Sequence, residues 1–317
     1  MVALPVTTAA QQRLVTELLA WGEARPPAGW ELVEQLRGRL ERELAERGPG
    51  VDELAAGRPG RQLVVTRTLL ERTVCDGLQL EPEPFRHTRD NVRAYLAVAA
   101  IERDWERQRR DQPEAVVAQV WDEEASRRPG DPSSRSAWLN ACDDRAALLE
   151  EVAGLVSVTR EVWPPFPPGS VRLHLRQPCR SELAGGRVAL RGTPDLVLDS
   201  ASPDDHARAL VVDLRTGLPR PGADRRAVRF DALLVALVAG RAPFRWASYH
   251  LTDGRAEYED LAAAPLHAVV DQVMEAIDQQ LRLRSLLPGV GDEALLLEGG
   301  AWCQGCRRRA GCPLAAV

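Results

Sequence analysis

Three cysteines near the C-terminal end lie close enough together to bind one metal centre. Cys303, Cys306 and Cys312 form the pattern Cys-x2-Cys-x5-Cys, followed by Pro313. Thiolates separated by such short turns can converge on one soft metal, and three ligands leave a fourth position to be filled from elsewhere. Six cysteines in 317 residues, three of them clustered, are not a disulfide framework. The spacing favours an iron-sulfur cluster; a structural zinc ion and three free thiols remain alternatives.

Two aspartates stand at the ends of neighbouring predicted strands. Asp195 completes Gly-Thr-Pro-Asp at the start of one strand, and Asp213 opens Asp-Leu-Arg-Thr-Gly at the end of the next. Carboxylates in this arrangement can share a hard divalent cation such as Mg²⁺ or Mn²⁺, which activates water and clamps a phosphate. Alternatively, both residues only cap turns beside Gly and Pro.

The elements that must position these residues change in type at the proline-rich segment 163–168. Before it, apolar residues recur at helical spacing; after it, short alternating and continuous apolar runs predict strands. The predicted helices are Asp90 to Arg110, Pro113 to Arg127, Ala137 to Val162, Arg226 to Ala239 and Pro265 to Leu283. The predicted strands are Val171 to Leu175, Arg187 to Leu190, Asp195 to Leu198, Ala209 to Leu214 and Trp246 to Leu251.

This order predicts an α+β fold, in which a mostly antiparallel meander is flanked by helices. Residues 1–60 form a helical N-terminal region, and residues 61–317 form one domain that includes a helical insert at about 90–162 and the cysteine tail at 303–312.

The order of these motifs resembles the RecB-like nucleases of the PD-(D/E)XK superfamily. Gly-x-x-Asp, a strand ending in Asp-x-Lys-Thr-Gly, an amphipathic helix and Cys-x2-Cys-x5-Cys-Pro are the layout of the members with a four-cysteine cluster, such as the AddB nuclease domain and the CRISPR-associated exonuclease. The resemblance spans roughly residue 62 to the end and implies a restriction-endonuclease-like core.

The resemblance also implies the ligands. A 4Fe-4S cluster would be bound by the three C-terminal cysteines and one far upstream, for which Cys75 matches better than Cys142 or Cys179. Asp195 and Asp213 would hold Mg²⁺ or Mn²⁺, with Glu102 on an upstream helix as the candidate third ligand.

The chain departs from the family at three positions near the predicted active site. Arg215 replaces the motif lysine, and Ala227 and Asp231 stand where the family usually has the Gln and Tyr of Gln-x-x-x-Tyr. Arginine is planar, bulkier and never deprotonated, so it does not replace the compact lysine charge in orienting water. Catalysis is therefore expected to be weakened or lost.

The formal net charge is −5, so the protein as a whole does not attract nucleic acid. Any nucleic-acid binding must therefore rest on a local basic patch or groove. The sequence contains no lysine, so arginine must supply every such contact. Arginines at 225, 226 and 229, and at 307–309, could contact phosphates or form ordinary surface charge. Trp163 and Trp246 could stack on bases, although core packing is favoured. No membrane span or secretory signal is predicted, which favours a cytoplasmic protein.

Three interpretations of function follow from these features. The first is a weakened metal-dependent deoxyribonuclease with a 4Fe-4S cluster, in which Asp195, Asp213 and Arg215 act on single-stranded DNA or DNA ends. The alternative is an inactive nuclease fold kept as a DNA-binding or subunit-docking scaffold, beside a helicase or other subunit in DNA repair or phage defence. A redox or iron sensor is a third interpretation.

Overall fold

The computed structural model describes residues 4–21, 23–27, 29–57, 59–71, 87–127, 131–166, 171–200 and 209–285. The helices are α1 (Ala9–Glu17), α2 (Trp30–Glu46), α3 (Gly48–Ala56), α4 (Arg67–Glu71), α6 (Arg89–Glu106), α7 (Pro113–Ser126), α8 (Arg135–Asn140), α9 (Arg145–Val162), α10 (Pro221–Ala239) and α11 (Ala263–Ser285), with 3-10 turns at Pro59–Arg61 and Ala184–Gly186. The strands are β1 (Leu63–Val65), β2 (Val171–Leu175), β3 (Cys179–Leu183), β4 (Val188–Gly192), β5 (Leu196–Ser200), β6 (Leu210–Arg215), β7 (Arg245–His250) and β8 (Arg255–Asp260).

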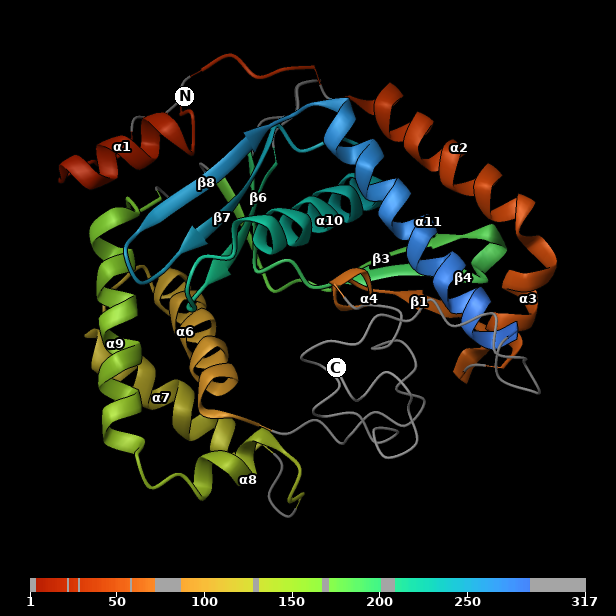
Figure 1. Cartoon of the computed structure of the whole chain (residues 1–317). Coiled ribbons are helices and arrows are strands. Elements are labelled where there is room, and N and C mark those ends of the chain that lie inside the picture. The colour runs from red at the N-terminus through yellow and green to blue at the C-terminus, as the bar shows by residue number, and fades with distance from the viewer. Residues whose placement is uncertain are drawn as a thin grey trace.

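Two sheets organise the molecule (Figure 1). The larger has the order β2-β5-β6-β7-β8, with β6 and β7 parallel and the other neighbours antiparallel. The smaller has the order β1-β4-β3, with β1 parallel to β4. The fold is therefore α+β with mixed sheets, consistent with a nuclease-like core.

The prediction that all the strands form a single meander is wrong. Strand β4 belongs to the smaller sheet, where it pairs with β1 and β3. Two strands of charged character, β3 and β8, were also missed. Both strands lie at the edge of a sheet, and many of their side chains are exposed to solvent. They therefore lack the apolar runs that mark a buried strand.

The larger sheet lies between two helical layers. Strand β6 is apolar on both faces, so both faces must be covered. Leu210, Val212 and Leu214 pack into one apolar core with α1, α6, α7 and α9, whereas Val211 packs into a second core with α10 and α11. Successive side chains of a strand point to opposite faces, so one strand serves both cores. Helix α10 therefore covers the same face to which Asp213 points.

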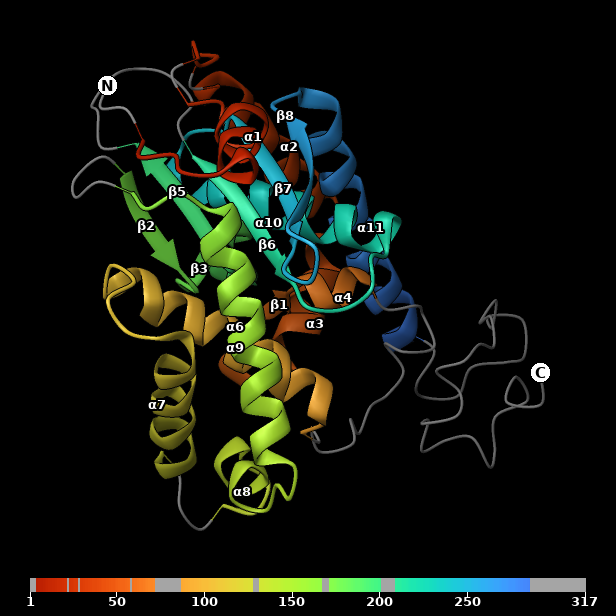
Figure 2. The same ribbon diagram turned by 90° about the vertical axis from the view of Figure 1, so that its left-hand side faces the viewer.

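The helices α6 to α9 extend away from the sheets as a lobe, which two views at right angles both show (Figures 1 and 2). The predicted helix from Ala137 to Val162 is in fact two helices, because the chain turns between Asn140 and Arg145. The N-terminal helices divide between the cores: Leu14 of α1 joins the first, and Leu36 of α2 joins the second.

The two tryptophans considered for base stacking are both in the interior. Trp163 and Trp246 are each 0% exposed, and they belong to different cores. Core packing is therefore confirmed for both.

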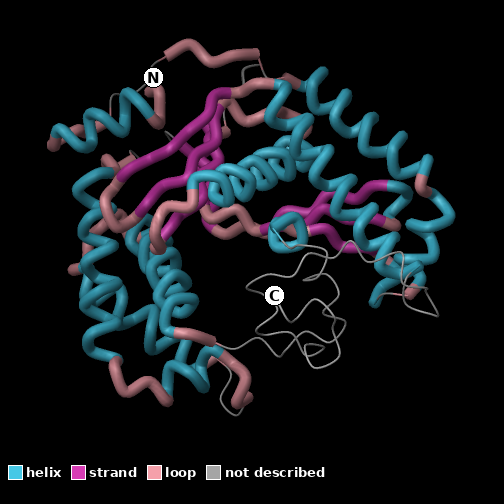
Figure 3. Tube along the Cα trace, viewed as in Figure 1, coloured by secondary structure: helices cyan, strands magenta, loops and turns pink. Residues whose placement is uncertain are grey.

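The smaller sheet lies beside α10, with α2, α3 and α11 along its outer side (Figure 3). Short α4 follows β1 directly and packs against α10 and α11. This packing brings Arg67, the first residue of α4, to the site where β5 begins and β6 ends. Among the described residues, no helix is both long and apolar enough to cross a membrane.

Candidate active site

The two predicted aspartates lie side by side. Antiparallel pairing of Leu196 with Val212 extends by one residue to place Asp195 opposite Asp213. The backbone N–H of Leu214 donates a 2.9 Å hydrogen bond to Oδ2 of Asp195, which fixes that carboxylate against the end of β6. The spacing of the two motifs thus produces the adjacent carboxylates that the sequence predicted.

The pair carries more negative charge than its surroundings stabilise. Burial, reinforced by the charge of Asp213, raises the pKa of Asp195 to about 8, although the hydrogen bond from Leu214 opposes the shift. Two carboxylates this close cannot both ionise cheaply in a partly buried position. The site therefore favours a proton or a cation beside Asp195 at neutral pH.

Arg215, which stands in place of the family lysine, turns toward the acidic groups. Its Nη2 is in ionic contact with Oδ2 of Asp213, and its Nε lies 3.5 Å from Oδ1 of Asp224 on α10. The Asp224 side chain is only 4% exposed, and its Oδ2 accepts a 2.7 Å hydrogen bond from the backbone N–H of Arg220. Arg215 thus links the strand to the first turn of the covering helix.

A second arginine enters the site from α4, and nothing in the sequence pattern pointed to it. Nη1 of Arg67 lies 3.0 Å from Oδ1 of Asp213 and 3.1 Å from Oδ2 of Asp231 on α10. Both carboxylates are almost fully buried. Arg67 therefore joins a short helix, a strand and the covering helix through a single nitrogen atom.

Asp231 lies in the site, where the sequence comparison noted only a replaced tyrosine. Asp224 and Asp231 are seven residues apart on α10, which is about two turns, so they share the face that meets the sheet. Burial raises the pKa of Asp231 to about 7, although Arg67 opposes the shift. The other replaced position, Ala227, is also buried on this helix.

Gly192, the first residue of the Gly-Thr-Pro-Asp motif, permits close approach of α10. A Cβ atom here would lie 2.9 Å from Cδ2 of Leu234 and 3.3 Å from Oδ1 of Asp231. A side chain here would therefore force the side chains of Leu234 and Asp231 to shift. The motif glycine therefore serves the packing of β4 against α10.

Strand β7 contributes two buried polar side chains to the row beside β6. The register places Ser248 opposite Asp213 and His250 opposite Arg215. Exposure is 2% for Ser248 and 1% for His250. Since parallel neighbours in register point to the same face, both extend the polar surface beneath α10.

Arg93 of α6 supports the loop that follows β6. Its Nη2 donates a 2.7 Å hydrogen bond to the backbone carbonyl of Thr216, and its Nη1 forms an ion pair with Glu151 of α9. The segment after Arg215 is therefore tied to the helical lobe.

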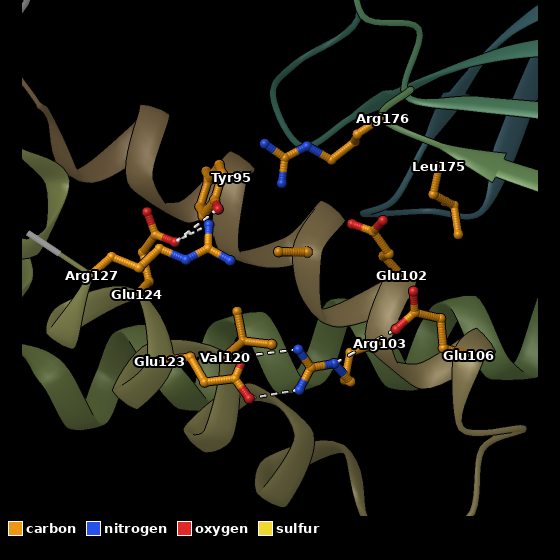
Figure 4. A pocket seen from close by; sticks show the side chains of 11 residues that line it. Tyr95, Glu102, Arg103, Glu106, Val120, Glu123, Glu124, Arg127, Leu175 and Arg176 are labelled. Carbon is orange, nitrogen blue, oxygen red and sulfur yellow. Dashed lines mark hydrogen bonds and ion pairs between the residues drawn. The ribbon is translucent and has the colours of Figure 1, made fainter. Parts of the chain in front are cut away.

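Glu102 lies elsewhere, in a polar pocket of about 340 Å³ between α6, α7 and the end of β2. Figure 4 shows Glu102 and Arg176 projecting into this pocket. Burial raises the pKa of Glu102, and the charge of Arg176 opposes that shift. The backbone N–H of Arg176 donates to the carbonyl oxygen of Asp195, so this pocket adjoins the aspartate pair. Glu102 as a third metal ligand remains a prediction.

The cysteines of the predicted cluster, Cys75, Cys303, Cys306 and Cys312, lie outside the described residues, as do the arginines at 307–309. Cys142 and Cys179 are free thiols, and they pack against different apolar cores.

On α10, Arg225 and Arg229 both pair with Glu259 of β8. Arg225 and Arg229 thus have a structural partner, which weakens their assignment to phosphates.

A divalent cation fits the chemistry of the site. Asp195 and Asp213 offer hard oxygen ligands, and burial together with the charge of Asp213 raises the pKa of Asp195, which a nearby cation would offset. Four carboxylates, those of residues 195, 213, 224 and 231, meet two guanidinium groups, those of Arg67 and Arg215. Within the described ranges, however, no group of three or more His, Cys, Asp or Glu side chains is arranged to hold a metal ion. Two protein ligands with water and substrate oxygens completing the shell suit Mg²⁺.

Comparison with known proteins identifies a superfamily. The family model of the PD-(D/E)XK nuclease superfamily matches residues 93–313, which is well over half of the chain. The chain therefore belongs to the PD-(D/E)XK nuclease superfamily. No curated protein matches it. Among solved structures, one described as "Crystal structure of SSO0001" matches with a TM-score of 0.32 and 13% identity, covering 89% of this chain and 96% of that chain.

Proposed function

We propose that this chain is a DNA-processing protein, and that it acts as a weakened metal-dependent deoxyribonuclease. The observation that carries the proposal is the Asp195–Asp213 pair at adjacent strand ends, in a chain that belongs to a nuclease superfamily. A divalent cation held by these two residues would polarise a phosphodiester and lower the pKa of the attacking water.

The protein's own residues perform the remaining tasks. The N–H of Leu214 orients Asp195, and Arg215 supplies positive charge beside Asp213. Because a guanidinium stays protonated, Arg215 can stabilise negative charge but cannot accept a proton from water. This limitation supports a slow reaction rather than a fast one.

We further propose that Cys75, Cys303, Cys306 and Cys312 bind a 4Fe-4S cluster, with zinc as the alternative metal. The support is the spacing of the last three thiols, which suits a soft metal centre, within the segment that the family model matches up to Pro313. The expected substrates are single-stranded DNA or DNA ends, with a helicase or other subunit as partner.

One observation favours the second candidate, an inactive DNA-binding or docking scaffold. Each oxygen of Asp213 is in ionic contact with a guanidinium group, Oδ1 with Arg67 and Oδ2 with Arg215. These contacts neutralise the carboxylate that a metal would need. In a scaffold, the same contacts would serve stability alone.

The test is an anaerobic preparation assayed for iron, zinc and cluster absorbance, followed by cleavage of labelled single- and double-stranded DNA with Mn²⁺. Cleavage that disappears in Asp213→Ala supports the nuclease. DNA binding without cleavage, unchanged in Asp213→Ala, supports the scaffold. Asp122→Ala, a change of an exposed carboxylate on α7, is the matched control.

A further inference from the structure

The contact between Arg67 and two buried carboxylates has the geometry of a cation site. One nitrogen, Nη1, lies 3.0 Å from an oxygen of Asp213 and 3.1 Å from an oxygen of Asp231. These carboxylates come from β6 and α10, which pack against each other. A positive charge between them offsets the repulsion that would otherwise separate strand and helix.

Burial makes this charge necessary. The side chains of Asp213 and Asp231 are 2% and 3% exposed, so water cannot replace a missing counter-charge. Arg67 itself is 33% exposed, and it projects from the five-residue helix α4. The cation thus comes from a short surface element, whereas the anions belong to the rigid core.

We infer that Arg67 is a resident counter-cation that competes with divalent metal for the carboxylates of the site. Its guanidinium occupies the position between Asp213 and Asp231, and a metal ion binds Asp213 tightly only when Arg67 moves out. This inference rests on the proposed metal site and adds to it the residue that sets its affinity.

Electrostatics give the direction of the effect. A guanidinium and a divalent cation sharing one carboxylate repel each other strongly at the separations that such sharing imposes, even at the effective dielectric of a protein surface. Removing the guanidinium charge also leaves Asp231 without its ion pair and Asp213 with Arg215 alone, which increases the attraction of both carboxylates for a metal. Both effects strengthen metal binding when Arg67 is neutralised.

The experiment measures Mn²⁺ affinity by calorimetry and by electron paramagnetic resonance at pH 8, for the wild type, Arg67→Gln, Arg67→Lys and Arg229→Gln. Arg229 lies on the same helix as Asp231 but pairs with Glu259, so Arg229→Gln is a matched loss of one ion pair. We expect Arg67→Gln to bind Mn²⁺ roughly tenfold more tightly or better, with Arg67→Lys and Arg229→Gln within about threefold of the wild type. The gain should disappear in Arg67→Gln/Asp213→Asn.

The outcomes separate the two proposals. Equal affinity in the wild type and Arg67→Gln overturns the inference and leaves the metal site intact. Absence of binding in both overturns the inference together with the proposed nuclease.

A measurement on the wild type covers the case in which Arg67→Gln does not fold. Hydrogen exchange of amides 66–71 should become faster when Mg²⁺ saturates the protein, because α4 loses the anchor of Arg67. Unchanged or slower exchange in this segment overturns the inference.

Discussion

The backbone N–H of Leu214 donates a hydrogen bond of 2.9 Å to Oδ2 of Asp195, and so couples the start of one strand to the end of the next. This bond favours the ionised carboxylate, but burial and the charge of Asp213 outweigh it and raise the pKa of Asp195 to about 8. The metal-free protein therefore incurs a cost whenever Asp195 ionises.

The first prediction concerns pH. An aspartate has a pKa of about 4 in the unfolded chain, so the raised folded value stabilises the protein at low pH, and this stability is lost as pH rises toward 8. In EDTA, the free energy of unfolding of the wild type should fall between pH 5 and pH 9, and Asp195→Asn should reduce that fall by about 2 kcal/mol or more. Urea unfolding at both pH values measures it. Asp122→Asn on the surface is the control, and an unchanged pH dependence in Asp195→Asn would refute the prediction.

The second prediction concerns the motif glycine. Gly192→Ala should destabilise the protein by about 1–3 kcal/mol, because its Cβ would press against Leu234 and Asp231. Gly217→Ala is the matched control, since a Cβ there meets nothing within 4 Å. Thermal and urea unfolding compare the two variants. Equal stabilities would show that α10 does not depend on the close approach.

The third prediction concerns the helical lobe. Asp104 is 2% exposed, and its carboxylate accepts hydrogen bonds from Nε and Nη2 of Arg160. Asp104→Ala should cost about 3–5 kcal/mol of unfolding free energy, because it leaves the Arg160 guanidinium without its carboxylate partner. Arg107→Ala, which removes an exposed pair with Asp111, should cost less than about 1 kcal/mol. Similar losses for both variants would contradict this assignment.

The fourth prediction concerns the cluster ligands. Cys75→Ser should lower the iron content of an anaerobic preparation, whereas Cys142→Ser and Cys179→Ser should retain it. Cys142 and Cys179 pack against different cores, and neither matches the upstream position of the resembled family as well as Cys75 does. Iron analysis and visible absorbance distinguish the variants. Full iron in Cys75→Ser with loss in one of the other two would reassign the fourth ligand.

The order of the longer helices and the apolar strands, and the meeting of Asp195 with Asp213, could be predicted from local patterns. An apolar run that ends in a carboxylate, followed by an amphipathic helix, carries its own periodicity, and antiparallel neighbours bring their opposite ends together. The division of the strands into two sheets could not be predicted this way, because β1 and β4 pair across a long stretch of chain. The edge strands β3 and β8 could not be predicted either, because they contain few apolar residues.

By itself, the sequence determined that two carboxylates meet at the ends of adjacent strands, and that Arg215 stands beside them in place of a lysine. Only the tertiary structure decided what surrounds them. Arg67 lies 146 residues before Asp213, and Asp231 comes from a helix that packs over the sheet. The strength of a buried charge pair depends on which groups exclude water and supply counter-charge, and those groups are brought together by packing between distant segments.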